Sequence, residues 1–205
     1  MPLKIYKPMA GYKNFLLVSL SLFLFSCQDP VHKNSLTPEQ QAELIAKGKK
    51  ITMLSFKALS GEVIDAINEG GVQNAVGYCH VQASPLIDSL SKVHQAKISR
   101  VSDRYRNPQN KPGELDLEVI HAYQKQLAEG SELQPHLEVT ADEVIFYSPI
   151  LILNPLCLNC HGEPGTTLEQ ANLDFIRSKY PDDRATGYKL GDLRGVWKIM
   201  MSSEF

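Results

Sequence analysis

Five consecutive residues late in the chain, Cys157 to His161, have types and spacing that could do chemistry. They form the pattern Cys-x-x-Cys-His, which is the attachment sequence of a c-type haem. Two thiols on one helical turn can each form a thioether to one porphyrin, and His161 can then bind the iron. With four Cys and six His in 205 residues, about 0.002 matches are expected by chance. The motif therefore predicts one covalent haem c per chain, held by Cys157, Cys160 and His161.

Two other kinds of site use a similar pair of cysteines. A zinc site would need further ligands at matching spacing, and the remaining candidates are Cys79, His80 and isolated histidines. A thioredoxin-like dithiol is expected at the turn into a helix of a βαβ unit. Cys157 instead follows an apolar run, residues 147–155, that contains two prolines. The sequence therefore favours haem attachment over both alternatives.

Cys79 is left over once Cys157 and Cys160 are assigned to thioethers. It could be an inert buried thiol, half of an intermolecular disulfide, or a thiolate bound to the iron. It lies on the apolar stripe of a predicted helix, where burial raises the pKa of a thiol, so an ionised Cys79 would need the iron to stabilise it. His80 is the rival ligand, but on a helix it points about 100° away, so the two cannot both face the iron. The other histidines of the domain are assigned to the surface or the core: His94, His121 and His136.

The first 26 residues have the pattern of a bacterial signal peptide. A basic stretch with three lysines comes first: Lys4, Lys7 and Lys13. An uncharged apolar run, residues 15–25, follows and is too short to span a bilayer as a helix. The run ends at Ser26 and Cys27, which resembles a lipobox in which Cys27 is lipidated and becomes the first mature residue. The alternatives are an uncleaved anchor and an ordinary signal peptide.

The leader and the composition together set the domain organisation. We predict a signal peptide (1–26), a tether without periodicity (27–36) and one folded domain (37–205). A hydrophobic content of 43% is ordinary for a globular fold. A formal charge of −2 and the lack of a Lys/Arg-rich run after the leader argue against a nucleic-acid partner. The predicted location is outside the cytoplasm, as a membrane-anchored lipoprotein of the periplasm or cell envelope.

The predicted elements of the folded domain are helices first and strands later. A capping box at Thr37 starts a helix that runs to about Leu59, with an extension to Ile67, and Gly70-Gly71 ends it. The other predicted elements are a helix at 72–92, a strand at 98–102, a helix at 114–129, a hairpin of 136–140 and 143–153 about Ala141-Asp142, a helix at 168–179, and a strand at 195–201. This order lacks βαβ alternation and predicts an α+β domain with N-terminal helices, a central antiparallel sheet, and the motif after the hairpin.

Four ordered blocks resemble a family of single-haem c-type proteins with a PAS-like fold, found alone in cyanobacteria and other bacteria and as the extracytoplasmic sensor part of kinases and chemoreceptors. The blocks are residues 75–79, residues 100–102 with 106–112, residues 157–162, and residues 180–188 leading into 191–195. The resemblance extends over about residues 40 to 201. It implies a PAS-like fold and an iron that is bound by His161 on one side and by Cys79, in preference to His80, on the other.

Arg100 and Arg106 are candidates for pairing with the haem propionates. A planar guanidinium matches a carboxylate through two parallel hydrogen bonds. The alternative places the two arginines at a strand edge and in a turn, where they contribute to solubility. Both residues lie in the blocks that carry the resemblance.

Two strong protein ligands leave no vacant position on an iron, which disfavours oxygen activation and peroxide chemistry. We therefore predict a non-enzymatic haem protein that senses redox state or gas, or that transfers single electrons. Reduction weakens an iron–thiolate bond, so Cys79 could leave and admit a small gas ligand. Signals or electrons would pass to a separate partner protein. The alternatives are a haem enzyme of the peroxidase or reductase type and a haem-free module that binds a small ligand.

Overall fold

The computed structural model describes residues 36–140 and 143–202. The chain divides into two units, Met1–Lys33 and Asn34–Phe205, and the described residues belong to the second. The predicted signal peptide, Cys27 and all but the last residue of the predicted tether lie outside the described residues, as does the predicted turn at Ala141-Asp142. Within the described ranges, no helix is long and apolar enough to cross a membrane.

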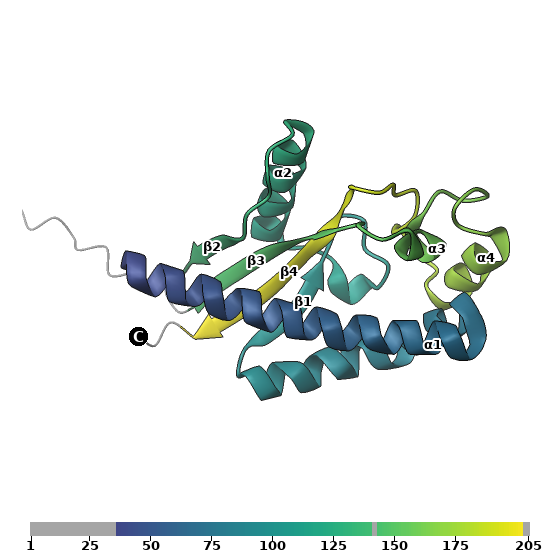
Figure 1. Ribbon diagram of the computed structural model, residues 1–205, viewed down its shortest axis with the longest axis horizontal. Coiled ribbons are helices and arrows are strands. Elements are labelled where there is room, and N and C mark those ends of the chain that lie inside the picture. Colours follow the sequence, from purple (N-terminus) through teal and green to yellow (C-terminus); the bar gives the residue numbers. More distant parts are fainter. Residues whose placement is uncertain (1–35, 141–142, 203–205) are drawn as a thin grey trace, which may run out of the picture. The chain divides into compact units, whose positions relative to one another are not determined.

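Helices and one antiparallel sheet make up the described domain, which confirms the predicted α+β class (Figure 1). The helices are α1 (Pro38–His94), α2 (Glu114–Ala128), α3 (Leu158–His161) and α4 (Gln170–Lys179), with short 3-10 helices η1 (Pro108–Asn110) and η2 (Pro155–Cys157). The strands are β1 (Lys97–Val101), β2 (His136–Val139), β3 (Glu143–Leu151) and β4 (Leu193–Ser202), in the order β1-β4-β3-β2. The bounds predicted for the strands, α2 and α4 lie within two residues of these, whereas α1 runs past the helix end predicted near Leu59 and includes the break predicted at Gly70-Gly71. The motif follows the β2–β3 hairpin, separated from β3 by residues 152–156.

α1 consists of two helical arms, the first arm (38–69) and the second arm (72–94), between which the chain turns back on itself (Figure 1). At the junction, Gly70 (φ −157°, ψ 22°) and Gly71 (φ 76°, ψ −171°) leave helical geometry. Glycine adopts the positive φ of Gly71 without the steric cost that a side chain would bring. The predicted break between two helices is therefore confirmed.

The first arm begins at the predicted capping box. The backbone N–H of Gln40 donates to Thr37 Oγ1 (3.2 Å), and the backbone N–H of Thr37 donates to Gln40 Oε1 (2.9 Å). Pro38 follows at a position where a helix needs no N–H donor. These local contacts fix where the arm starts, as the sequence pattern predicts.

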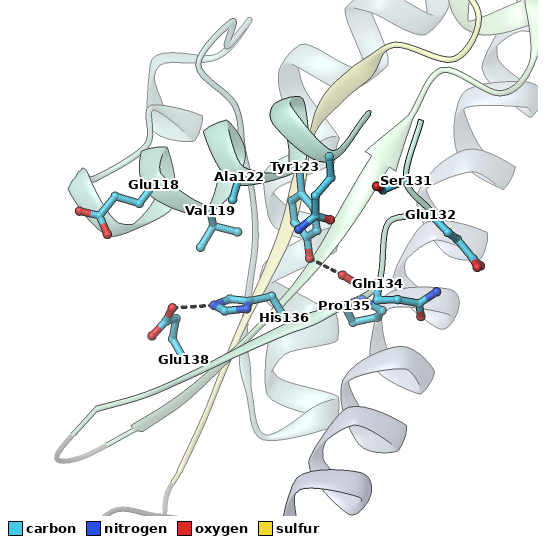
Figure 2. A pocket seen from close by; sticks show the side chains of 11 residues that line it. Glu118, Val119, Ala122, Tyr123, Ser131, Glu132, Gln134, Pro135, His136 and Glu138 are labelled. Carbon is cyan, nitrogen blue, oxygen red and sulfur yellow. Dashed lines mark hydrogen bonds and ion pairs between the residues drawn. The ribbon is translucent and has the colours of Figure 1, made fainter. Parts of the chain in front are cut away.

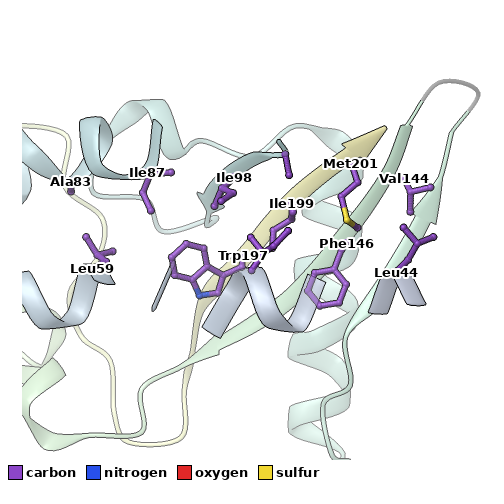
Figure 3. Close-up of a cluster of buried hydrophobic side chains, with 12 residues drawn as sticks. Leu44, Leu59, Ala83, Ile87, Ile98, Val144, Phe146, Trp197, Ile199 and Met201 are labelled. Carbon is purple, nitrogen blue, oxygen red and sulfur yellow. The ribbon is translucent and has the colours of Figure 1, made fainter. Parts of the chain in front are cut away.

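Both faces of the sheet are buried. On one face a cluster joins the two arms of α1 to the strands (Figure 3), and its members include Leu44, Leu59, Ala83, Ile87, Val144, Phe146, Trp197, Ile199 and Met201. The other face packs on α2 through Val119, Ile120, Tyr123, Ile145, Tyr147 and Val196. Successive residues of a strand point to opposite faces, so a strand that is buried on both sides has a continuous apolar sequence. This explains the unbroken apolar runs of β3 and β4.

Gly48 of the first arm lies directly against the ring of Phe146, which is fully buried. A Cβ at Gly48 would overlap that ring. We therefore expect Gly48→Ala to lower the free energy of unfolding by about 1–3 kcal/mol through overpacking. Gly61→Ala on the same arm is the matched control, because a Cβ there meets nothing within 4 Å. It should raise stability by about 0.5–1 kcal/mol. Denaturant unfolding measures both changes, and equal effects of the two substitutions would contradict the packing argument.

A buried carboxylate, Asp116, joins α2 to the sheet. It accepts hydrogen bonds from Tyr147 Oη (2.6 Å) and from the backbone N–H of Gly113 (3.0 Å), and Lys198 Nζ lies 2.7 Å from Asp116 Oδ1. Burial alone would raise the pKa of Asp116. The hydrogen bonds from Lys198, Tyr147 and Gly113 have a larger combined effect in the opposite direction, so the pKa of Asp116 is below its ordinary value. The ionised form of Asp116 therefore stabilises the fold.

Asp116→Asn should lower the free energy of unfolding at pH 7 by about 1.5–3 kcal/mol, since charged hydrogen bonds are lost and Lys198 keeps no counter-charge. The pKa of Asp116 is depressed in the folded state, so its contribution is fully present above the unfolded pKa of about 4 and is lost as the pH falls through the folded value. The stability difference between the two chains should therefore shrink below about pH 4. Denaturant titrations across pH 2–7 test this expectation, and a difference that does not change with pH would refute it.

Candidate functional site

Cys79 and the three motif residues line one cavity, between the arms of α1 and the segment that follows β3. Its volume is about 440 Å³, within the range of about 300–1,000 Å³ that is common for cofactor sites. The first arm supplies a mainly apolar wall: Phe56, Leu59, Ser60, Val63, Ile64 and Ile67. The second arm contributes Ala75, Val76 and Cys79, and the motif contributes Cys157, Cys160 and His161. The structure thus brings together residues that lie about eighty positions apart in the chain.

A smaller cavity of about 200 Å³ continues from this one toward the sheet. The two share five lining residues: Phe56, Leu59, Arg100, Cys157 and His161. The smaller cavity also reaches Trp197 and Arg194 of β4. We call the larger cavity the main lobe and the smaller one the sheet lobe.

Local sequence builds the short turn that carries the motif. Asn154 Oδ1 accepts a hydrogen bond from the backbone N–H of Leu156 (2.9 Å), and Pro155 occupies the first position of η2. The helical turn of α3 follows and ends where the backbone N–H of Gly162 donates to the carbonyl of Leu158 (2.8 Å). The motif is therefore held in the helical conformation that its spacing requires.

His161 is a neutral imidazole with one nitrogen free. Its Nδ1 lies 2.8 Å from the carbonyl oxygen of Ala185. Because a carbonyl oxygen only accepts, Nδ1 carries the proton and Nε2 keeps its lone pair. Burial lowers the pKa of His161 well below its ordinary value, and the charges of Arg194 and Arg106 lower it further. A neutral, oriented imidazole of this kind can bind a metal through Nε2.

Arg106 braces the motif against the segment that positions His161. Its Nε and the carboxylate Oδ1 of Asp183 are 3.0 Å apart, and the Asp183 side chain is 2% exposed. Arg106 Nη2 donates to the carbonyls of Cys160 (2.6 Å) and Ala185 (3.3 Å). Arg106 lines the main lobe, but these hydrogen bonds are directed at protein groups. These contacts do not test the predicted pairing of Arg106 with a haem propionate.

Arg100 projects from β1 and lines both lobes. Its guanidinium carbon lies 5.8 Å from the centre of the Trp197 ring. Within the described ranges this guanidinium makes no hydrogen bond and no ion pair. Burial lowers its pKa, an effect that Cys79 and Tyr180 oppose. Arg100 is thus a half-buried cation that is open to the cavity.

Arg194 is a second such cation, and it was not among the predicted site residues. It lines the sheet lobe together with His161, and Arg194 Nη1 donates to the carbonyl of Arg104 (3.2 Å). Arg194 Nε is inaccessible to solvent and has no hydrogen-bond partner among the described residues. Burial lowers the pKa of Arg194 to about 10. The only sequence signal was its place in the last block of the family resemblance, because residue type and strand spacing do not distinguish it.

Cys79 lies on the cavity wall, whereas its neighbour His80 does not. Cys79 is a half-buried free thiol, and burial raises its pKa while Arg100 and Arg106 lower it. The ring of His80 packs edge-on against Tyr180, with 5.0 Å between ring centres, and it lines neither lobe. The described part of the chain contains no cluster of three or more His, Cys, Asp or Glu residues that could hold a metal ion. Cys79 and His161 thus line the same mainly apolar cavity, and His80 does not.

A further cavity of about 620 Å³ lies between α2 and β2 and contains none of the predicted site residues (Figure 2). Two interactions join residues of its wall. Tyr123 Oη donates to the carbonyl of Gln134 (2.9 Å), and His136 Nε2 lies 2.5 Å from Glu138 Oε1. His136 is partly exposed here. This cavity offers no comparable set of chemically active side chains.

The fold and the site define the class: an α+β domain in which a helical hairpin and an antiparallel sheet enclose an apolar cavity lined by cysteine, histidine and arginine. The family model for Tll0287-like proteins matches residues 31–202. The chain belongs to the Tll0287-like family.

The chain is also similar in fold to a solved structure, that of the cyanobacterial heme-protein Tll0287. The two are 22% identical, the match covers 82% of this chain and 98% of that chain, and the TM-score is 0.56. No curated protein matches the sequence.

Proposed function

We propose that the chain binds one haem covalently through Cys157 and Cys160, with His161 and Cys79 as the two axial ligands of the iron. The observation that carries this proposal is the single cavity that all four residues line. The family supports it, since the similar cyanobacterial protein is described as a heme-protein. We also propose that the fold is PAS-like, as the resemblance implies.

The residues of the cavity fit a large, flat, mainly apolar group. Several apolar side chains on its wall are exposed: Phe56 (57%), Ile64 (44%) and Leu156 (37%). Contiguous exposed apolar surface marks a ligand or partner site. A porphyrin in the cavity would cover these side chains, and the half-buried arginines on the wall suit the carboxylates that it carries.

The bound group supplies one-electron iron chemistry. The chain supplies the two ligands, His161 as a neutral imidazole and Cys79 as a thiolate beside two arginines, and an apolar wall that excludes water. Two protein ligands favour redox sensing, gas sensing or electron transfer over catalysis, so we propose that the protein is not an enzyme. Release of Cys79 in the reduced state would open a position for a small gas ligand, and a separate redox or signalling protein would receive the output.

We also propose that a lipid on Cys27 anchors the domain to a membrane outside the cytoplasm. The leader pattern supports this location. The Cys-x-x-Cys-His motif supports it too, because c-type attachment in bacteria takes place on the outer side of the inner membrane.

The proposal is tested by producing the full chain together with a c-type maturation system. A haem-stained band on a denaturing gel and a six-coordinate low-spin ferric spectrum that peroxide leaves unchanged are expected. An unstained band would contradict covalent attachment and favour the haem-free module. A high-spin spectrum with peroxide turnover would favour the haem enzyme.

A further inference from the structure

The cavity has an unbalanced charge. Three arginines line its two lobes, Arg100, Arg106 and Arg194, and neither lobe is lined by a carboxylate. Arg106 is neutralised by Asp183. Arg100 and Arg194 form no ion pair with a carboxylate within residues 36–140 and 143–202. Two half-buried positive charges therefore face the cavity without a carboxylate partner from the described chain.

Such an arrangement is costly unless a ligand completes it. A buried charge needs a partner and hydrogen bonds, because the desolvation penalty otherwise exceeds what the fold gains. Arg194 Nε shows this need most clearly, as it is shielded from solvent and lacks an acceptor. Among the described residues Arg194 also forms no ion pair. Its Nη1 donates to the Arg104 carbonyl, and its guanidinium carbon lies 5.5 Å from the centre of the Tyr188 ring.

We propose that Arg100 and Arg194 bind the two propionate carboxylates of the haem, which makes the sheet lobe the propionate site. This inference rests on the proposed function. The charges match, because two guanidinium groups meet two carboxylates, and the planar guanidinium suits bidentate pairing. Arg194 takes the role in place of Arg106, because Arg106 is already paired with Asp183 and its Nη2 donates to the carbonyls of Cys160 and Ala185.

The sheet holds both arginines in place. Arg100 on β1 stands in register with Trp197 on β4. The carbonyl of Arg194 accepts a hydrogen bond from Ser102 Oγ (2.8 Å). The neighbouring residue Gly195 has φ +155°, and a Cβ there would lie 2.5 Å from the carbonyl oxygen of Val101. Close packing of β1 on β4 therefore fixes the backbone from which Arg194 projects.

The test compares haemin with haemin dimethyl ester, whose propionates are neutral. The full chain with Cys157→Ser and Cys160→Ser binds either compound without thioethers. Esterification should weaken binding about 10- to 100-fold, the equivalent of one or two charged hydrogen bonds. With Arg100→Gln and Arg194→Gln added, the ratio should fall to about one. Arg184→Gln is the control, since Arg184 is exposed, stacks on Tyr105 (5.1 Å) and lines neither lobe. It should keep the full discrimination.

Equal binding of haemin and its ester to the chain with both arginines would overturn the inference. A second measurement uses the covalent holoprotein, in which the resonance Raman bands of the propionates should shift in Arg100→Gln and Arg194→Gln but not in Arg184→Gln. If the serine variant binds no haemin, the resonance Raman comparison tests the inference by itself, and unshifted propionate bands in Arg100→Gln and Arg194→Gln would overturn it. An unstained wild-type band is a different result, because it removes the proposed function itself.

Discussion

Replacing Cys79 with alanine is expected to leave the haem covalently attached and to raise its midpoint potential. An anionic thiolate stabilises ferric iron, and axial ligands span a range of about 0.8 V in haem proteins, so a rise on the order of 0.1 V or more is expected. The ferric iron should become high-spin or take water beside His161. Potentiometric titration measures the first change and electron paramagnetic resonance the second.

His80→Ala is the matched control for this experiment. His80 is the next residue on the same helical arm, but its ring packs on Tyr180 and it lines neither lobe. It should leave both the spectrum and the potential unchanged. If Cys79→Ala gave an unaltered spectrum while His80→Ala changed it, the second ligand would be His80.

Replacing both Cys157 and Cys160 with serine is expected to abolish haem staining of the denatured band. Thioether bonds survive denaturation, whereas coordination by His161 and Cys79 does not, since it depends on the folded cavity. Each single substitution leaves one thioether and should give a weaker stain. Staining of denatured gels, normalised to protein, measures the effect.

Cys79→Ala is the control for the double substitution, because it also removes a cavity thiol but leaves both predicted thioethers. Its stain should equal that of the unaltered chain. A stained double variant would show that another residue holds the haem, and an unstained Cys79→Ala chain would show that the stain reports folding instead of attachment.

Local sequence determined much of the fold. The Thr37 capping box and the Gly70-Gly71 break depend on interactions between residues within a few positions of each other, so the start of α1 and the break between its arms followed from sequence patterns. The α+β class followed from the order of helical and strand periodicities. The spacing from Cys157 to His161 likewise selected a chemistry, because one helical turn presents those side chains together.

Only the tertiary structure decided how distant residues share the cavity. Helical periodicity separated Cys79 from His80, but only the packing of the second arm shows that Cys79 is the one on the wall. Arg106 and Arg194 are alike by residue type, yet the fold gives one of them the Asp183 carboxylate and leaves the other with a buried Nε that lacks an acceptor. Burial and charge balance arise from contacts between segments far apart in the chain, which no local pattern contains. The sequence alone could therefore identify the Cys-x-x-Cys-His motif, while the arginines that line the cavity beside it depend on the assembled sheet and helices.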